Sequence, residues 1–265
     1  MSMQNKTANP NDATDVELPM SAPSLLEHPA LKPLHPYWRS FTPKAATVVL
    51  TGKNRTLEKT TTETFAAEVL KKVFELDTAL AGLRIAKKFI LNAVPDLGLS
   101  EFRYHYENFL SRATGINDRS HRLVGASFKL GVKNFEKPGG NSYVQKKLEV
   151  RAPEVHAALT AIEHVVSSYK NQRNDTIHSN AFSCEVLSSL YLIQEFDPEQ
   201  WKTTDVREIK QAYFSINGNE IGQVIDDLTG PLDTLLNSLS LTYVNAIQAS
   251  PQLNRQRKTH APPHR

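Results

Sequence analysis

Residues 153–178, PEVHAALTAIEHVVSSYKNQRNDTIH, decide the fold of this chain. Apolar side chains recur in this stretch at steps of three and four residues, the spacing that places them on one face of an α-helix. The stripe predicts one helix over residues 153–173 that packs against other helices. Pro153 is compatible with the first turn of this helix, where its missing N–H has no partner to lose. The stripe consists of Val155, Leu159, Ile162, Val166 and Tyr169, and its last member is Arg173.

A second apolar stripe starts where the first one ends. Arg173 ends the first stripe and His178 begins the second, at positions where apolar residues are expected. Arginine is always charged, and histidine has a reference pKa near neutral pH. Such groups are costly to bury unless they have a partner or a task. Residues 173–178 are therefore the first candidates for a functional site. The second stripe consists of His178, Phe182, Val186, Leu190 and Ile193.

Similar stripes predict helices over most of the remaining chain. Two of these helices are long and cover residues 62 to about 94 and residues 100 to about 130, and a short one covers residues 143–150. The sequence shows no series of alternating strands. The predicted fold class is therefore all-α, an up-and-down helical bundle with two long helices.

Two glycine-containing pairs interrupt the stripes near the C-terminus. After Pro198, one helix is expected to end at Asn217-Gly218, because glycine commonly follows the last turn of a helix. A further stripe predicts a last helix, which Gly230-Pro231 is expected to kink or split.

Residues 1–60 differ from the rest of the chain because prolines punctuate them. Proline fixes φ and removes an N–H donor, so it interrupts regular structure. We expect an irregular, proline-rich N-terminal arm over residues 1–60, in which residues 46–50 form one short strand. The helical domain then covers residues 61–249, and residues 250–265 form a flexible basic tail.

The composition predicts a cytoplasmic protein without a membrane segment. The 265 residues carry a formal net charge of +3, and the sequence isoelectric point is about 8.8, which permits an anionic partner without requiring one. Cys184 is the one cysteine, so no intrachain disulfide can form and a reducing compartment is expected. No uninterrupted apolar run is long enough to span a bilayer.

The string from Arg173 to His178 resembles the signature of the HEPN superfamily, whose name stands for higher eukaryotes and prokaryotes nucleotide-binding. Its members usually carry a segment Arg-Asn-x-x-x-His, and this chain has Arg173, Asn174 and His178 in that order. A helix is predicted before this match and another apolar stripe after it, which separates it from three other matches to the bare Arg–His pattern. Those matches are Arg151–His156, Arg255–His260 and Arg257–His264.

The resemblance implies a helical bundle, and for many members a ribonuclease. It also implies a homodimer whose packed motif helices form a composite active site, a reaction that needs no metal or other cofactor, and a product with a 2′,3′-cyclic phosphate. Members often act as toxins or in defence against phage. A regulatory protein partner that restrains the activity is therefore implied as well, and RNA is the implied substrate.

The residue types suit RNA cleavage on chemical grounds. Imidazole has a reference pKa of about 6.5, so His178 can accept or donate a proton near neutral pH. The guanidinium of Arg173 is a planar donor that stays protonated and can stabilise the charge on a phosphorane. Asn174 is four residues before His178 and shares its helical face if the helix is continuous. Arg173 and His178 would be about 140° apart on such a helix.

Structural and noncatalytic roles remain alternatives. Arg173 can bind last-turn carbonyls, and His178 can cap or bridge helices. A noncatalytic helical module that binds a nucleotide, an RNA or a protein partner is the alternative function, and a structural subunit of a larger assembly is a third. A metal site is a weaker option, because its candidates lack the spacing of known zinc motifs: His156, His164, Glu154 and Glu163.

The second long helix offers two further sets of candidates. Its aromatic residues can stack on bases, but at helical spacing Phe102, Tyr106 and Phe109 fit the core better, and Tyr104 is off that stripe. Its arginines can line a phosphate track or form a solvated charged face, and the second role is the commoner one. They are Arg103, Arg112, Arg119 and Arg122.

Overall fold

The computed structural model describes residues 24–51, 59–92, 97–178, 182 and 184–249, without the side chain of His178. Within these residues the structure contains helices and no strands, so the all-α prediction is confirmed. Short 3-10 helices η1 (Leu25–Glu27) and η2 (Pro29–Leu31) come first. The α-helices are α1 (His35–Thr51), α2 (Thr61–Asn92), α3 (Leu99–Ser127), α4 (Val132–Phe135), α5 (Gly140–Leu148), α6 (Pro153–Ser167), α7 (Tyr169–His178), α8 (Glu185–Phe196), α9 (Pro198–Trp201) and α10 (Thr204–Gln248).

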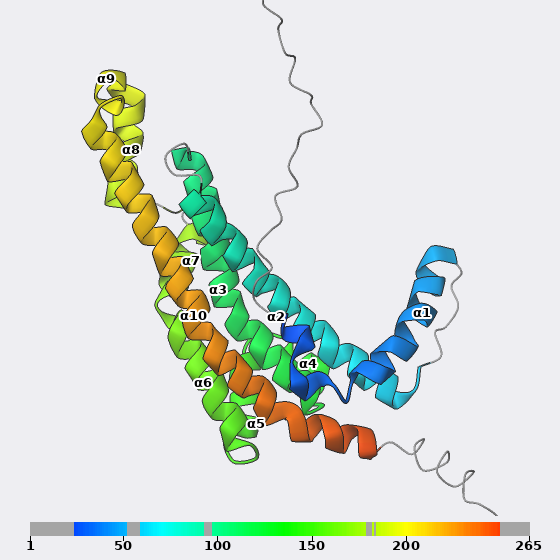
Figure 1. Cartoon of the computed structure of the whole chain (residues 1–265). Coiled ribbons are helices and arrows are strands. Elements are labelled where there is room, and N and C mark those ends of the chain that lie inside the picture. The colour runs from blue at the N-terminus through cyan, green and yellow to red at the C-terminus, as the bar shows by residue number, and fades with distance from the viewer. Residues whose placement is uncertain (1–23, 52–58, 93–96, 179–181, 183, 250–265) are drawn as a thin grey trace, which may run out of the picture.

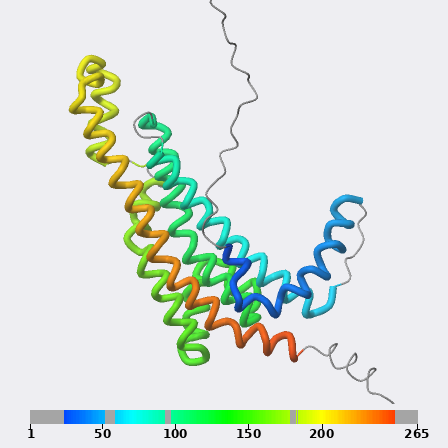
Figure 2. The backbone as a smooth tube through the Cα atoms, viewed as in Figure 1, coloured from blue at the N-terminus to red at the C-terminus, as the bar shows by residue number. Residues whose placement is uncertain are grey.

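The long helices run alongside one another in alternating directions (Figure 1). α2 packs against α3 and α10, and α6 packs against α3 and α10, so these four helices enclose a common core. α7 continues the direction of α6 and contacts α3 (Figure 2). α8 and α9 lie at one end of the bundle beside the start of α10, while α1 projects at the other end (Figure 1).

The predicted stripes of the two long helices form this core. The stripe members inside the two helices are at most 3% exposed, as the spacing of three and four residues predicts. On α2 they are Val69, Val73, Leu76, Leu80 and Leu83, and on α3 they are Phe102, Tyr106, Phe109, Ala113, Ile116 and Leu123. Leu130, the last predicted member of the stripe on the second long helix, lies beyond the end of α3 at Ser127 and is only partly buried.

α10 is one helix of 45 residues, so the predicted end at Asn217-Gly218 is wrong. Gly218 faces α2, and a Cβ built on it would lie 2.7 Å from Cγ of Leu91, which is closer than atoms can pack. This glycine therefore allows two helices to approach each other. α10 also continues through Pro231, where buried apolar residues on either side hold the helix against the bundle despite the missing N–H.

The N-terminal segment is more regular than its prolines suggest. Residues 46–50, expected as a strand, belong to α1, and Pro43 lies inside this helix. Thr47 donates a side-chain hydrogen bond to the carbonyl of Pro43 at 2.9 Å, which suits a helix. Local β-propensity is a weak preference, and here the helix that starts at His35 continues through residues 46–50 although Val49 and Leu50 are exposed.

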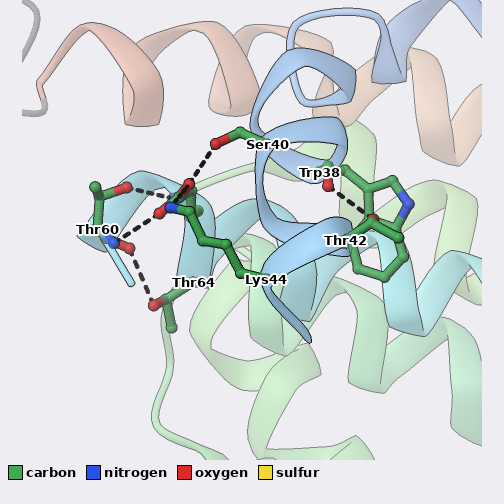
Figure 3. A network of polar contacts seen from close by, with 7 residues as sticks. Trp38, Ser40, Thr42, Lys44, Thr60 and Thr64 are labelled. Carbon is green, nitrogen blue, oxygen red and sulfur yellow. Dashed lines mark hydrogen bonds and ion pairs between the residues drawn. The ribbon is translucent and has the colours of Figure 1, made fainter. Parts of the chain in front are cut away.

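Glu63, at the start of α2, fixes α1 to the bundle. Figure 3 labels three of its partners, Ser40, Lys44 and Thr60. The buried carboxylate of Glu63 accepts hydrogen bonds from Ser40 Oγ at 2.6 Å and Lys44 Nζ at 2.7 Å, both on α1. It also accepts from the backbone N–H of Thr60 at 2.9 Å, while Thr60 Oγ1 accepts from the N–H of Glu63 at 3.0 Å. This reciprocal pair is a capping box.

Among the described residues, no helix is both long and apolar enough to cross a bilayer.

Candidate functional site

The candidate motif lies on α7, a helix separate from α6. The predicted helix over residues 153–173 is interrupted at Ser168, after which α7 starts at Tyr169. The first stripe is nevertheless buried as predicted from Val155 to Tyr169. Arg173, its last member, is half-buried and lies at the boundary between the core and solvent.

Tyr169 fixes the start of α7 to two other helices. Its ring packs edge-on against Phe109 of α3, with ring centroids 5.1 Å apart. Its hydroxyl donates a hydrogen bond to Oε1 of Glu220 on α10 at 2.8 Å. Burial, followed by this contact with the Glu220 carboxylate, raises the pKa of the Tyr169 hydroxyl, so it stays protonated and keeps donating.

Phe182 fixes the chain just beyond α7 to α3. Its ring packs on that of Tyr106, with centroids 4.5 Å apart. Its backbone N–H donates to Oε1 of Glu107 at 2.7 Å. Contacts with α3 therefore hold the chain on both sides of the motif.

The polar contacts of Arg173 are local. Its Nη1 donates a hydrogen bond to Oδ1 of Asn174 at 3.2 Å. Its Nε is buried and makes no hydrogen bond with the part of the chain that the structure describes. An unpaired buried N–H costs free energy, and a ligand or partner that accepts from it would recover that cost.

His178 is the last residue of α7, and its side chain lies outside the described part of the structure. The backbone alone fixes how the motif positions are related. α7 is continuous from Tyr169 to His178, so Asn174 and His178 occupy positions on one face of the helix. The positions of Arg173 and His178 are about 140° apart around the same axis.

The second predicted stripe does not form one helix. α8 starts at Glu185, and Phe182 and Cys184 have no helical conformation. Val186 is 40% exposed, whereas Leu190 is buried. Cys184 is the N-cap residue just before α8, and its Sγ lies 2.9 Å from the hydroxyl of Tyr213 on α10.

The other candidates separate into core and surface. Phe102, Tyr106 and Phe109 are buried, as expected of core residues, and Tyr104 is 63% exposed. No group of three or more metal-ligating side chains is present among the described residues. Glu163, a metal candidate, accepts from Lys170 at 2.6 Å, and this contact lowers the pKa of its carboxyl.

A match to a family model shows to which protein family this chain belongs. The model described as HEPN_Cthe2314-like HEPN matches residues 57–245. The chain belongs to this HEPN family. The match begins just before α2 and extends almost to the end of α10, so it includes α7.

Membership in HEPN indicates an RNA-related or nucleotide-binding module. No curated protein and no solved structure matches the chain.

Sequence reasoning missed Glu107 and Glu220, the residues that position the motif. Glu107 lies in the stretch of α3 between the core residues Tyr106 and Phe109, and Glu220 lies just before the core residue Ile221. The only local indication that these two carboxylates make contacts inside the bundle is that each is adjacent in sequence to a buried residue. The partner of Glu107 is 75 residues away and that of Glu220 is 51 residues away, beyond any local pattern.

Proposed function

We propose that this HEPN protein is a metal-independent endoribonuclease that cleaves RNA by attack of the 2′-hydroxyl. His178 is the general acid or base, Arg173 stabilises the phosphorane, and Asn174 supports them. The observation that supports the proposal is that Arg173, Asn174 and His178, which resemble the HEPN signature, lie on one continuous helix, α7, within the matched residues. The Nε of Arg173 is also buried without an acceptor among the described residues.

The reaction divides into proton transfer and charge stabilisation. A base removes the proton of the 2′-hydroxyl, the 2′-oxygen bonds to phosphorus, and the bond from phosphorus to the 5′-oxygen breaks. The leaving oxygen takes up a proton, so the products are a 2′,3′-cyclic phosphate and a free 5′-hydroxyl. Imidazole suits both proton transfers near neutral pH, and guanidinium suits the charge on the phosphorane.

The direction of the motif positions supports a homodimer. Since Arg173 and His178 are about 140° apart around α7, one protomer presents them in different directions. Two α7 helices packed together would bring an arginine of one protomer toward a histidine of its partner. Ile177, which is 55% exposed, offers an apolar contact for such packing. RNA is the proposed substrate, and a regulatory protein partner, a role as toxin or in phage defence and a cytoplasmic location belong to the same proposal.

Incubation of the purified protein with total RNA in excess EDTA tests the proposed reaction. We expect cleavage to survive chelation and the products to end in a 2′,3′-cyclic phosphate with a free 5′-hydroxyl. RNA that is bound but remains intact would contradict cleavage and favour the noncatalytic module. Cleavage that EDTA abolishes would contradict the metal-independent reaction.

Mixed dimers test the composite site. Arg173→Ala and His178→Ala protomers are co-expressed with different tags, and the heterodimer is purified through both tags. If one protomer supplies arginine and its partner supplies histidine, the heterodimer keeps one complete pair and recovers part of the activity that each homodimer lacks. A heterodimer that forms but does not cleave would contradict the composite site.

A further inference from the structure

The face shared by α2 and α3 carries a group of arginines separate from the α7 motif. Arg112, Arg119 and Arg122 all lie half-buried on α3. Arg112 and Arg119 are seven residues apart, about two turns, so they point to the same side of the helix about 10 Å apart along its axis. Burial, and then the nearby charges of Arg112 and Arg122, lower the pKa of Arg119, with Glu75 and Asp118 opposing the shift. We call the three residues the arginine face.

Two glycines make room for these side chains. A Cβ built on Gly82 of α2 would lie 2.5 Å from Cδ and Nε of Arg112. A Cβ built on Gly115 of α3 would overlap Nη1 of Arg119. The side chains of Arg112 and Arg119 therefore lie close against the helices, in space that the side chain of any residue other than glycine at positions 82 and 115 would fill.

The carboxylates near the arginine face are held by other groups. Glu75 accepts from Lys72 at 3.4 Å, and Asp118 accepts from Asn141 at 2.6 Å. Glu136 also accepts from Lys72, at 2.8 Å. The ion pairs among the described residues include none of the three arginines. Half-buried guanidinium groups without paired carboxylates fit an anionic ligand.

Exposed aromatic rings continue the same face toward the start of α3. Phe89 of α2 is 48% exposed and stacks on His105 of α3, with centroids 4.6 Å apart and an interplanar angle of 9°. Tyr104 is 63% exposed and meets His105 edge-on at 5.3 Å. His105 is seven residues before Arg112, so it shares the side of α3 that carries Arg112 and Arg119.

Arg103 does not belong to this face. Its guanidinium lies over the ring of Tyr191 on α8, 4.5 Å from the centroid. The four arginines that the sequence grouped are therefore separated into one that packs on α8 and three on the α2–α3 side.

We propose that the face of α2 and α3 is a track for single-stranded RNA, in which the arginine face holds phosphates and the Phe89, His105 and Tyr104 rings stack on bases. This inference rests on the proposed function, in which RNA is the substrate, and it adds that the RNA is bound as a single strand. Unpaired bases can stack on protein rings, whereas those of a duplex are stacked on one another. A second copy of the chain fits this face less well, because a contact between copies would bury like charges whose nearby carboxylates are already engaged.

Binding of a fluorescent 2′-O-methyl oligouridine of about 12 nucleotides tests the track, because this probe has no 2′-hydroxyl and stays intact. The triple variant Arg112→Gln, Arg119→Gln, Arg122→Gln is compared with the matched variant Arg39→Gln, Arg151→Gln, Arg207→Gln, whose arginines are exposed elsewhere. We expect the first variant to bind the probe at least about tenfold more weakly than the wild type. The slope of log association constant against log salt concentration should become shallower by about 2, because each of the three lost phosphate contacts contributes about 0.7. The matched variant should bind like the wild type at equal salt.

A variant with unchanged net charge tests whether binding depends on where the guanidinium groups lie. Gly82→Ala combined with Gly115→Ala keeps every arginine but displaces the two guanidinium groups. We expect weaker binding of about threefold or more, with a melting temperature that is unchanged or higher, because alanine favours a helix over glycine and the displaced atoms are the ends of flexible side chains.

Four outcomes would overturn the track: no binding by the wild type, wild-type affinity in the arginine variant, an equal loss in both triple variants, or an arginine variant that turns monomeric while the matched variant stays dimeric. The last outcome would identify the face as a contact between protomers. Cleavage of unmodified RNA is measured in parallel. Track-dependent binding without cleavage would refute the nuclease and keep the track, whereas cleavage with wild-type binding in the arginine variant would refute the track alone.

Discussion

Tyr169 of α7 donates a hydrogen bond to Glu220 of α10 across 2.8 Å. This bond joins the helix that carries the candidate motif to α10, the longest helix of the described bundle. Tyr106 of α3 lies beside the same carboxylate, and burial followed by the charge of Glu220 raises the pKa of its hydroxyl. The position of α7 is thus set by a polar contact within an aromatic part of the core.

Tyr169→Phe should therefore destabilise the protein and misplace the motif. The ring that packs on Phe109 remains, while Glu220 loses its donor, so we expect a loss of about 1–2 kcal/mol in the free energy of unfolding. Chemical denaturation measures this loss, and RNA cleavage should fall as well. Glu220→Gln keeps an acceptor oxygen and should have a smaller effect. Equal stability of wild type and Tyr169→Phe would contradict the anchoring role.

Glu107 should control the order of the chain just after the motif. Glu107→Ala removes the acceptor of the Phe182 N–H, whose hydrogen bond is 2.7 Å long. We expect faster hydrogen exchange at the Phe182 amide and slower RNA cleavage, because the end of α7 loses its connection to α3. Glu107→Gln is the matched control, since it retains a carbonyl oxygen as acceptor. Unchanged exchange at Phe182 in the alanine variant would exclude this role.

Glu63 should make the fold sensitive to acid. Hydrogen bonds from Lys44 and then Ser40 lower its pKa from 4.5 to about 2 in the folded chain. The unfolded chain then binds the proton more readily, so the stability that Glu63 contributes is complete above about pH 5 and is lost as pH falls toward 2. Glu63→Gln should cost about 2 kcal/mol at pH 7 and flatten the decline in stability between about pH 5 and about pH 2.

Glu68→Gln provides the control for Glu63, because Glu68 lies exposed on the same helix and its substitution changes the net charge equally. Urea denaturation at a series of pH values measures both variants. A Glu63→Gln protein that loses stability in acid as steeply as the Glu68→Gln protein would show that the network around Glu63 carries no such dependence.

Asn174 should have a supporting effect on cleavage. Its Oδ1 accepts from Arg173 Nη1 at 3.2 Å, and its position shares a helical face with that of His178. Asn174→Ala should slow cleavage about tenfold, which corresponds to about 1.4 kcal/mol, and leave the melting temperature unchanged because the side chain is exposed. Single-turnover cleavage rates measure the effect. A rate equal to that of the wild type would remove Asn174 from the proposed site.

The sequence patterns predicted those parts of the fold that depend on local periodicity. The stripes of α2 and α3 are buried as predicted, because an apolar face with helical spacing has no other way to leave water. The predicted helix end at Gly218 is wrong because glycine can either end a helix or permit close helix packing, and only the contact with Leu91, distant in sequence, distinguishes the two. Residues 46–50 show the same limit, because their β-propensity favours a strand while the chain continues there as helix α1.

The sequence predicted a helix up to Arg173, and the structure shows helical conformation through His178 on α7. The role of Arg173, Asn174 and His178 as a functional site stays a prediction. The contacts of Phe182 with Glu107 and of Tyr169 with Glu220 join residues distant in sequence, so no local pattern predicts them. The stripe register also placed Arg173 deeper than it lies, because the break at Ser168 separates α7 from α6.

The central claim is that Arg173 and His178 act on the phosphodiester, and RNA cleavage by single-residue variants in EDTA tests it most directly. Arg173→Ala and His178→Ala are compared with Asn171→Ala, which changes an exposed side chain of the same helix. We predict that each of the first two lowers the cleavage rate at least about 100-fold while circular dichroism and dimer formation stay as in the wild type, and that Asn171→Ala keeps the full rate. Full activity in either Arg173→Ala or His178→Ala would contradict the account.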